Sequence, residues 1–416
     1  MSAENRICFF SGDITRNGGT ERVAAMIANG LSNRGFSVCF LSLVEQKKNP
    51  FFDISEAVPR YVLKEDGNWV SPGPGYLPMV PKLRKFLKQQ EIKVLIDIDI
   101  VLDVLSLPAV AGREIKVISW EHFNVPYERE FLYRRAILHL TARFSGYIVT
   151  LTRQDKENYE KLLNRKGRIT FIYNPIEPKK FSKIKKEKAF QGKERRRIEA
   201  AEQIKIEQKE KKRKAADPKW AEKEQKEADQ ERAEQKEKAL ITVGRLIERK
   251  GIDMLARIAP KLLKKHKDWK WYVLGDGELR GLLEETVAKY GLEKQLILTG
   301  NVTNVEAYLE KSSIYVMTSR IEGLPMCLLE AAGCDLPCVS FDIPTGPAEI
   351  IEQGKNGFLI SAFDVEKMEK TLDRLMEEDA ALKELTEAAA GYRKTLEAKF
   401  SKEAILDQWE ELLGKL

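Results

Sequence analysis

Short apolar strands alternate with helices at the start of this chain, and that alternation limits the folds it can adopt. Residues 7–10 and 38–43 are apolar runs rich in strand formers, and residues 23–33 between them have the spacing of a helix. Gly35 follows the helix at a position where helices often end. Because strands joined through a helix usually run parallel, the sequence predicts an α/β fold built on parallel sheets.

The second part of the chain repeats this pattern. Helix formers fill residues 326–332, and short apolar runs stand at residues 240–243, 271–274, 297–299 and 314–317. A chain of 416 residues is also too long for one ordinary domain. We therefore expect an N-terminal domain at residues 1–178, a second domain at residues 239–399 and a C-terminal amphipathic helix at residues 400–416.

A charged segment, residues 183–238, separates the two halves. It contains 20 Lys and Arg against 14 Asp and Glu, so it supplies most of the chain's net charge of +7. Its Glu, Lys, Gln and Ala content predicts two exposed helices joined near Asp217 and Pro218, without the heptad seam of a coiled coil. It is either a solvated insertion or a docking arm for an anionic partner. Nucleic-acid binding is disfavoured because aromatic residues are nearly absent.

Composition limits the compartment and the cofactors. No apolar run is long enough to span a membrane, and the N-terminus lacks the apolar stretch of a signal peptide, so we expect a cytoplasmic protein. The five cysteines lack metal-ligand spacing and are expected to be reduced core residues. With only three histidines, we expect no metal site.

The segment from Thr318 to Glu330 is the strongest candidate for a functional site. It connects a predicted strand to a predicted helix, and Pro325 fits the first helical turn while Gly323 permits a tight loop. The free amides of Met326 and Cys327, with the positive end of the helix dipole, would suit a phosphate or diphosphate. Glu322 and Glu330 would then accept hydrogen bonds from sugar hydroxyls. A ligand with both a diphosphate and sugar hydroxyls is a nucleotide sugar.

Two further strand-to-helix turns carry phosphate-binding features. Gly18 and Gly19 precede the first helix and allow close approach of backbone to a ligand. The six-residue glycine fingerprint of dinucleotide enzymes is absent, which argues against an NAD dehydrogenase. In the second half, Arg245 and Lys250 place two cations at one turn, suited to a diphosphate.

Three other features of the sequence have competing interpretations. Asp97 and Asp99 alternate along a strand predicted for residues 94–102, and we interpret them as solvated strand-end aspartates rather than metal ligands. His122 follows another strand, where a lone histidine is more often structural. Residues 127–144, with four arginines, and residues 81–88 are basic and amphipathic, so each can lie on an anionic membrane or pack on a core.

These motifs resemble, in order and spacing, those of the family-four retaining glycosyltransferases with the GT-B fold. The resemblance rests on Glu322 and Glu330, with seven residues between them, and on Arg245 and Lys250. It covers both ends of the chain, and residues 183–238 fall outside it. It implies two Rossmann-like domains that face each other across a cleft, with the C-terminal helix crossing back onto the first domain.

The resemblance also implies roles for single residues. Glu322 is expected to bind donor-sugar hydroxyls, and Glu330 is expected to bind the ribose. His122 is expected to reach the sugar from the opposite domain, so Glu322 and His122 are the catalytic candidates. The other donor-binding positions that it implies are Gly18, Gly19, Arg245, Lys250, Gly275, Val302, Gly323, Leu324, Met326 and Cys327.

The implied reaction moves a hexose or N-acetylhexosamine, with retention, from a nucleotide sugar to a glycan or polyprenyl-linked acceptor. UDP is the expected nucleotide, and neither a metal nor another cofactor is expected. Such an enzyme would serve polysaccharide or cell-envelope synthesis, either free or on the inner face of the membrane. Two alternatives remain: an epimerase or phosphorylase with the same fold, and a non-catalytic scaffold acting through residues 183–238.

Overall fold

The N-terminal domain is built on a parallel sheet of seven strands. The computed structural model describes residues 6–69, 74–124, 132–164, 167–176 and 236–416. The strand order is β3-β2-β1-β4-β5-β6-β7. The strands are β1 (Arg6–Ser11), β2 (Val38–Ser42), β3 (Arg60–Val62), β4 (Ile92–Ile98), β5 (Lys116–Trp120), β6 (Tyr147–Thr150) and β7 (Ile169–Phe171). The main helices are α1 (Gly19–Asn33), α2 (Met79–Gln89), α3 (Asp103–Val110), α5 (Leu132–Phe144) and α6 (Arg153–Leu163).

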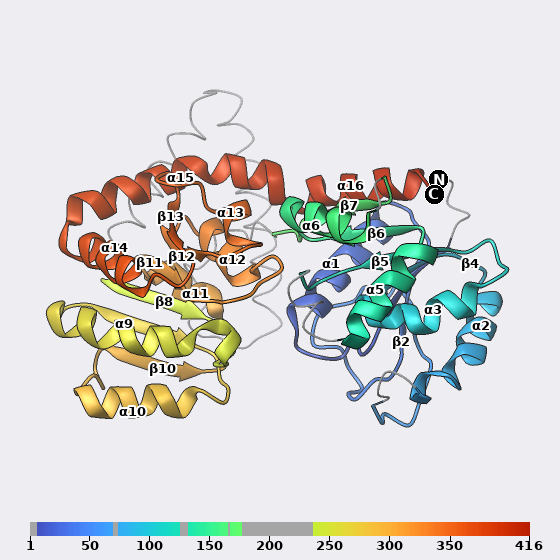
Figure 1. Ribbon diagram of the computed structural model, residues 1–416, viewed down its shortest axis with the longest axis horizontal. Coiled ribbons are helices and arrows are strands. Elements are labelled where there is room, and N and C mark those ends of the chain that lie inside the picture. Colours follow the sequence, from blue (N-terminus) through green and yellow to red (C-terminus); the bar gives the residue numbers. More distant parts are fainter. Residues whose placement is uncertain (1–5, 70–73, 125–131, 165–166, 177–235) are drawn as a thin grey trace, which may run out of the picture.

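The C-terminal domain has a parallel sheet of six strands in the order β10-β9-β8-β11-β12-β13. These are β8 (Ala239–Val243), β9 (Lys270–Leu274), β10 (Leu296–Gly300), β11 (Ile314–Met317), β12 (Cys338–Asp342) and β13 (Gly357–Ser361). Its helices are α9 (Ile252–Lys265), α10 (Arg280–Tyr290), α11 (Val305–Lys311), α12 (Met326–Gly333), α13 (Pro347–Ile350), α14 (Val365–Glu377) and α15 (Asp379–Phe400). The expected α/β fold with two Rossmann-like domains is confirmed (Figure 1).

Each sheet reverses its direction of winding next to its first strand. β1 pairs with β2 on one side and with β4 on the other, and β8 likewise lies between β9 and β11. The helices after these strands leave on opposite faces, which opens a crevice at the carboxyl ends of the strands. The loops after β1, β8 and β11 lie at these carboxyl ends, where folds of this kind bind ligands, and they carry Gly18, Arg245 and Glu322.

The strands are apolar on both faces because helices cover both faces of each sheet. Ile7, Cys8, Phe9 and Phe10 of β1 are all fully buried. A strand in the middle of such a sheet reads as a continuous apolar run instead of an alternating one. This explains why runs such as residues 7–10 identified the strands.

Residues 94–102 do not form the single strand that was predicted. β4 ends at Ile98, and Asp99, with a φ of 93°, begins a short 3-10 helix at Ile100–Leu102. Asp97 is not solvated either, since its side chain is fully buried and accepts a hydrogen bond of 2.7 Å from Ser106 Oγ. The apolar pattern of residues 94–102 alone did not show that the strand ends at Ile98 and that a 3-10 helix follows.

Asp97 and Asp103 form a buried carboxyl pair inside the N-terminal domain. Burial and the neighbouring Asp103 raise the pKa of Asp97 well above its usual value. Burial also raises the pKa of Asp103 to about 6. Ser119 Oγ donates a hydrogen bond of 2.7 Å to Asp103. Two carboxyl groups so close in an apolar interior favour sharing a proton over ionising together.

The helix expected to cross back from the second domain is α16 (Lys402–Gly414). Ser401 caps it by accepting a hydrogen bond from the amide of Ala404. Figure 1 shows α15 running over the C-terminal domain and α16 continuing over the N-terminal domain. There the ring of Trp409 lies 4.9 Å from that of Trp120, and Arg34 at the end of α1 pairs with three carboxylates of α16.

The basic helix predicted for residues 127–144 is present from Leu132 onward as α5, and residues 125–131 lie outside the described part. Arg134 does not belong to a solvated basic face, because its side chain is buried and its Nη2 lies 2.9 Å from Asp99. Leu132 and Phe144, in contrast, are 81% and 64% exposed. The exposed face of α5 is therefore more apolar than the composition predicted.

Three further expectations concern the charged segment, membrane spans and metal sites. The predicted charged helices at residues 183–238 are described only at residues 236–238, so they stay a prediction. Within the described ranges, no helix is long and apolar enough to cross a membrane. In the same ranges, no group of three or more His, Cys, Asp or Glu side chains is arranged to hold a metal ion.

Candidate active site

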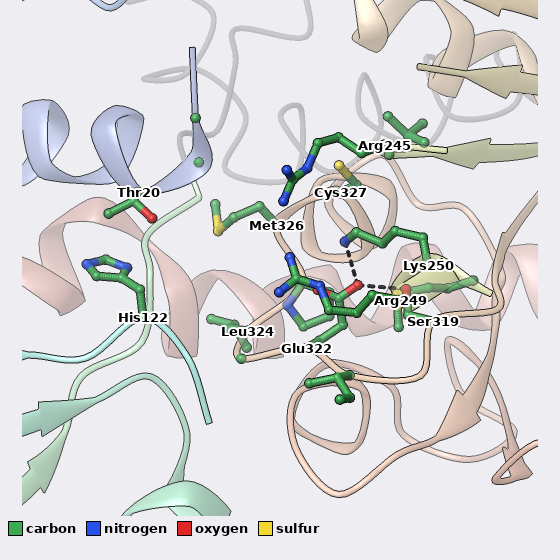
Figure 2. A pocket seen from close by; sticks show the side chains of 18 of the residues that line it. Thr20, His122, Arg245, Arg249, Lys250, Ser319, Glu322, Leu324, Met326 and Cys327 are labelled. Atoms are coloured by element: carbon green, nitrogen blue, oxygen red, sulfur yellow. Dashed lines mark hydrogen bonds and ion pairs between the residues drawn. The ribbon is translucent and has the colours of Figure 1, made fainter. Parts of the chain in front are cut away.

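A cavity of about 600 Å³ lies between the two domains, where the loops after β1, β8 and β11 meet. Figure 2 shows Thr20 and His122 on the side of the N-terminal domain, facing Arg245, Lys250 and Glu322 on the other side. Most of the residues predicted from the sequence line this cavity: Gly18, Gly19, His122, Arg245, Lys250, Glu322, Gly323, Leu324, Met326 and Cys327. The fold therefore gathers ten positions that are far apart in sequence.

The loop between β11 and α12 ends in an open helix N-terminus. Pro325 is the N-cap and lies just outside the helix, one position before the first turn in which it was expected. Its carbonyl accepts the helical bond from the amide of Leu329. The amides of Met326 and Cys327 precede that bond, so they have no partner within the helix. They point to a position where an anion is favoured by the helix dipole.

Glu322 is fixed by contacts from both domains. Its Oε1 accepts hydrogen bonds of 2.6 Å from Lys250 Nζ and 2.6 Å from Ser319 Oγ (Figure 2). Its backbone carbonyl accepts a hydrogen bond of 2.8 Å from Asn124 Nδ2 of the N-terminal domain and a second one from Thr345 Oγ1. The second carboxylate oxygen has no hydrogen bond to another described residue and can accept hydrogen bonds from a ligand.

Glycine is required at two positions around this loop. A Cβ on Gly323 would lie 2.7 Å from the carbonyl oxygen of His122, so the two domains touch here at backbone distance. Gly251 has a φ of 65°, and a Cβ there would lie 1.9 Å from the carbonyl oxygen of Thr318. This close approach brings Lys250 next to the β11–α12 loop.

His122 is a neutral group at the cavity wall. Its side chain is almost fully buried, and burial lowers the pKa of His122 to about 3. Its ring packs 4.6 Å from the ring of Trp120, and Nε2 has no hydrogen-bond partner within the described residues. A neutral imidazole in this position can donate or accept one hydrogen bond to a sugar hydroxyl, but it does not serve as a positive charge.

The cavity is positively charged. Its lining contains four cations, Arg16, Arg245, Arg249 and Lys250, against the carboxylates Glu21 and Glu322. Arg16 lies 3.1 Å from Glu21, and Lys250 lies 2.6 Å from Glu322, so these pairs nearly balance. Among the described lining residues, cations therefore outnumber carboxylates by four to two, and this balance suits an anionic ligand.

Three predicted positions lie outside this cavity. Glu330 borders a second cavity of about 390 Å³ and forms an ion pair with Arg22 of α1. Gly275 lines neither of the two, and a Cβ there would lie 1.9 Å from the carbonyl oxygen of Gly244, which is a structural reason for glycine. Val302 packs against the main hydrophobic core. Ligand contacts for these three residues stay predictions.

Sequence reasoning missed several residues of the site. Arg249 directly precedes Lys250, and its charge beside a predicted phosphate-binding lysine was an available signal. Ser319 and Asn124 lie in motifs that were recognised, but nothing in the sequence shows that their side chains reach Glu322. Arg22 belongs to the glycine-rich turn of α1, and its partner stands 308 residues away.

Two family models match the chain, one on each half. The model described as "Glycosyltransferase Family 4" matches residues 17–180. The model described as "Glycosyl transferases group 1" matches residues 223–392. Together they include every described residue that lines the cavity except Arg16.

Several similar proteins are named as glycosyltransferases. An uncharacterized glycosyltransferase of Haemophilus influenzae is 27% identical over 98% of this chain and 99% of its own length. A Campylobacter jejuni N-acetyl-D-galactosaminyltransferase, named for an undecaprenol-linked substrate, is 24% identical over 80% of this chain and 78% of its own length. The structure of Anabaena HepE in complex with UDP superposes with a TM-score of 0.72 at 16% identity, covering 99% of this chain and 100% of that one.

Proposed function

The chain is a glycosyltransferase with the GT-B fold, and we propose that it moves a hexose or N-acetylhexosamine, with retention, from a UDP-sugar to a glycan or lipid-linked glycan acceptor. One observation carries this proposal. The open N-terminus of α12, Lys250, Arg245 and Glu322 converge in one cavity between the domains. This set combines an anion site with a carboxylate that accepts hydrogen bonds from hydroxyls, as a nucleotide sugar requires.

We assign the donor groups as follows, with all of them in this cavity except Glu330, which borders the second cavity. The amides of Met326 and Cys327, with Arg245 and Lys250, bind the diphosphate and stabilise the charge that develops on it as the sugar leaves. The free oxygen of Glu322 accepts hydrogen bonds from the sugar hydroxyls. Glu330 accepts hydrogen bonds from the ribose, and neutral His122 contacts the sugar from the opposite domain.

In this proposal the configuration of the sugar is retained because the acceptor displaces the diphosphate on the front face of the sugar. Among the described residues of the lining, the two carboxylates, Glu21 and Glu322, are each already held by a cation. Neither is therefore well suited to attack the sugar as a nucleophile, and we propose that the acceptor enters on the same face as the leaving diphosphate. Arg245, Lys250 and the helix amides supply the positive charge that a divalent cation provides in other transferases. We therefore propose that turnover continues in EDTA.

A donor screen tests the proposed function. Wild type, Glu322→Ala and the surface control Glu352→Ala are heated with UDP-sugars and GDP-sugars, and nucleotide release is measured with polyprenyl-linked acceptors. We expect UDP-sugars to raise the melting temperature of wild type and acceptor-dependent UDP release that Glu322→Ala abolishes and Glu352→Ala retains. No response to any nucleotide sugar would contradict a transferase role.

The same screen separates the alternatives. An epimerase would convert a nucleotide sugar without acceptor, and a phosphorylase would need inorganic phosphate as acceptor. The family matches and the relatives named as transferases do not favour either. The scaffold alternative depends on residues 183–238, which lie outside the described residues except for residues 236–238.

A lipid-linked acceptor would bring the enzyme to a membrane surface, and α5 is the proposed contact. Leu132, Tyr133, Leu140 and Phe144 are exposed on this helix, beside the exposed basic residue Arg143. Exposed apolar side chains next to basic ones bind anionic lipid surfaces. Sedimentation with vesicles of anionic and of neutral lipids tests this, and we expect Leu132→Ser with Phe144→Ser to reduce binding to the anionic vesicles.

A further inference from the structure

The first turns of α1 and α12 face each other across the cleft. Figure 2 shows Thr20 of α1 opposite Met326 of α12. A Cβ added to Gly19 would reach Met326 Cγ at 4.0 Å, so the two helix starts lie close to each other. Further along the same helices, Arg22 and Glu330 form an ion pair between the domains. This pair therefore lies beside the proposed diphosphate site and belongs to neither domain alone.

Arg22 and Glu330 are bound to each other and to no other side chain in the described part of the protein. Arg22 Nη1 donates to Glu330 Oε1, and the two side chains are 29% and 19% exposed. They are therefore partly shielded from water. Both residues border the second cavity, and Arg22 also borders a third cavity of about 430 Å³. A ligand in the second cavity would meet Glu330 with one of its oxygens already occupied.

A carboxylate has about four acceptor positions on two oxygens. Arg22 uses Oε1, which leaves Oε2 for the hydroxyls of a ribose. The guanidinium also offsets the negative charge of Glu330, which would otherwise repel a diphosphate bound at the start of the same helix. The pair can therefore stay intact while the donor is bound, and it orients Glu330 toward the ribose.

We propose that Arg22 is a positioning residue for the donor ribose, acting through Glu330 from the opposite domain. This inference rests on the proposed function, in which Glu330 contacts the ribose. Because Arg22 belongs to the N-terminal domain, Glu330 is oriented only while the two domains are in contact at α1 and α12. Donor binding is in this way coupled to the contact between the domains.

Calorimetry with UDP and with 2′,3′-dideoxy-UDP tests the proposal directly. The second ligand lacks both ribose hydroxyls, so the ratio of the two Kd values reports the ribose contact of Glu330. We expect Arg22→Ala to weaken UDP binding by about 5- to 20-fold. The Kd of 2′,3′-dideoxy-UDP should change by less than about threefold. The ratio of the Kd of 2′,3′-dideoxy-UDP to that of UDP should therefore fall toward one in the variant. In turnover assays the variant should raise the KM for the donor more than it lowers kcat.

Two variants control the experiment. Arg22→Lys keeps the positive charge and should recover part of the UDP affinity, whereas loss of folding would not be repaired in this way. Arg34→Ala removes ion pairs at the other end of α1. Their partners on α16, Glu403 and Asp407, line none of the three cavities. It should leave both Kd values unchanged.

The outcomes separate this inference from the proposed function. If wild type binds UDP and Arg22→Ala leaves the ratio of Kd values unchanged, or tightens UDP binding, the positioning role of Arg22 is overturned while the transferase function stands. If wild type binds neither UDP nor a UDP-sugar, the proposed donor is wrong and the role of Arg22 is overturned with it.

Discussion

Gly323→Ala should impair turnover by pushing the β11–α12 loop, which carries the proposed catalytic residue Glu322, away from the N-terminal domain. The added Cβ would lie 2.7 Å from the carbonyl oxygen of His122 and 3.6 Å from Leu151 Cδ1. A carbon and an oxygen normally come no closer than about 3.3 Å, so the two segments must separate by roughly 0.6 Å. The backbone of Gly323 itself is not in the left-handed region, and the effect is therefore steric.

The size of the effect follows from the residue before it. Glu322 is bound to the N-terminal domain by the 2.8 Å hydrogen bond from Asn124, which such a shift would stretch. A displacement of about 1 Å at a catalytic group can lower the rate by roughly 100-fold. We therefore expect kcat/KM to fall by about 10- to 50-fold. The gap between the domains can open to relieve the clash, so stability should fall by only about 1 kcal/mol.

The assay compares Gly323→Ala with Gly281→Ala in UDP release and in thermal melting. Gly281 lies in α10, where an added Cβ meets nothing within 4 Å. Gly281→Ala should therefore keep full activity and gain up to about 1 kcal/mol of stability. If Gly323→Ala keeps kcat/KM within about threefold of wild type, the contact between His122 and Gly323 does not position Glu322, and this reasoning is refuted.

Three further predictions concern charge, pH and the crossing helix. Lys250→Met should lower kcat/KM by roughly 100-fold, because a cation at the proposed diphosphate site is lost, whereas the surface control Lys261→Met should not. Asp97→Asn should be more stable than wild type at pH 8 by roughly 1–3 kcal/mol, measured by urea unfolding, and the difference should shrink toward pH 4. Trp409→Ala should lose about 3–5 kcal/mol of unfolding free energy, because it removes a fully buried aromatic side chain.

The pH prediction depends on the sign of the linkage. The raised pKa values of Asp97 and Asp103 mean that the folded protein holds more protons than the unfolded chain between about pH 4 and the folded pKa values. The stability of wild type therefore falls as pH rises through this range. Asparagine keeps an acceptor for Ser106 but cannot ionise, so a larger stability gain at pH 4 than at pH 8 would contradict the account.

The other two predictions have equally direct tests. If Lys250→Met kept the wild-type kcat and the wild-type KM for the donor, the lysine would only pair with Glu322 and would not reach the diphosphate. For Trp409→Ala, an unfolding free energy within about 1 kcal/mol of wild type would show that α16 is held mainly by its ion pairs to Arg34.

The amino-acid sequence by itself determined the elements and the loops that carry chemistry. Strands such as residues 7–10 and the start of α12 are local patterns of apolar residues, glycine and proline, and such patterns depend only on neighbours in the chain. For the same reason local patterns pointed to most of the ten lining positions, whereas His122 and Leu324 followed from the resemblance to a known family. In parallel α/β sheets the carboxyl ends of the strands share one crevice.

Only the tertiary structure decided which side chains meet. Asn124 reaches the carbonyl of Glu322 across 198 positions, and Arg22 reaches Glu330 across 308. It also decided that Asp97 and Arg134 are buried, where the sequence suggested solvent. Such contacts depend on how two domains face each other and on which side of a strand or helix is covered. Hydrophobic periodicity does not encode these relations for a polar residue, because burial of a charge is set by the partner that the fold brings to it.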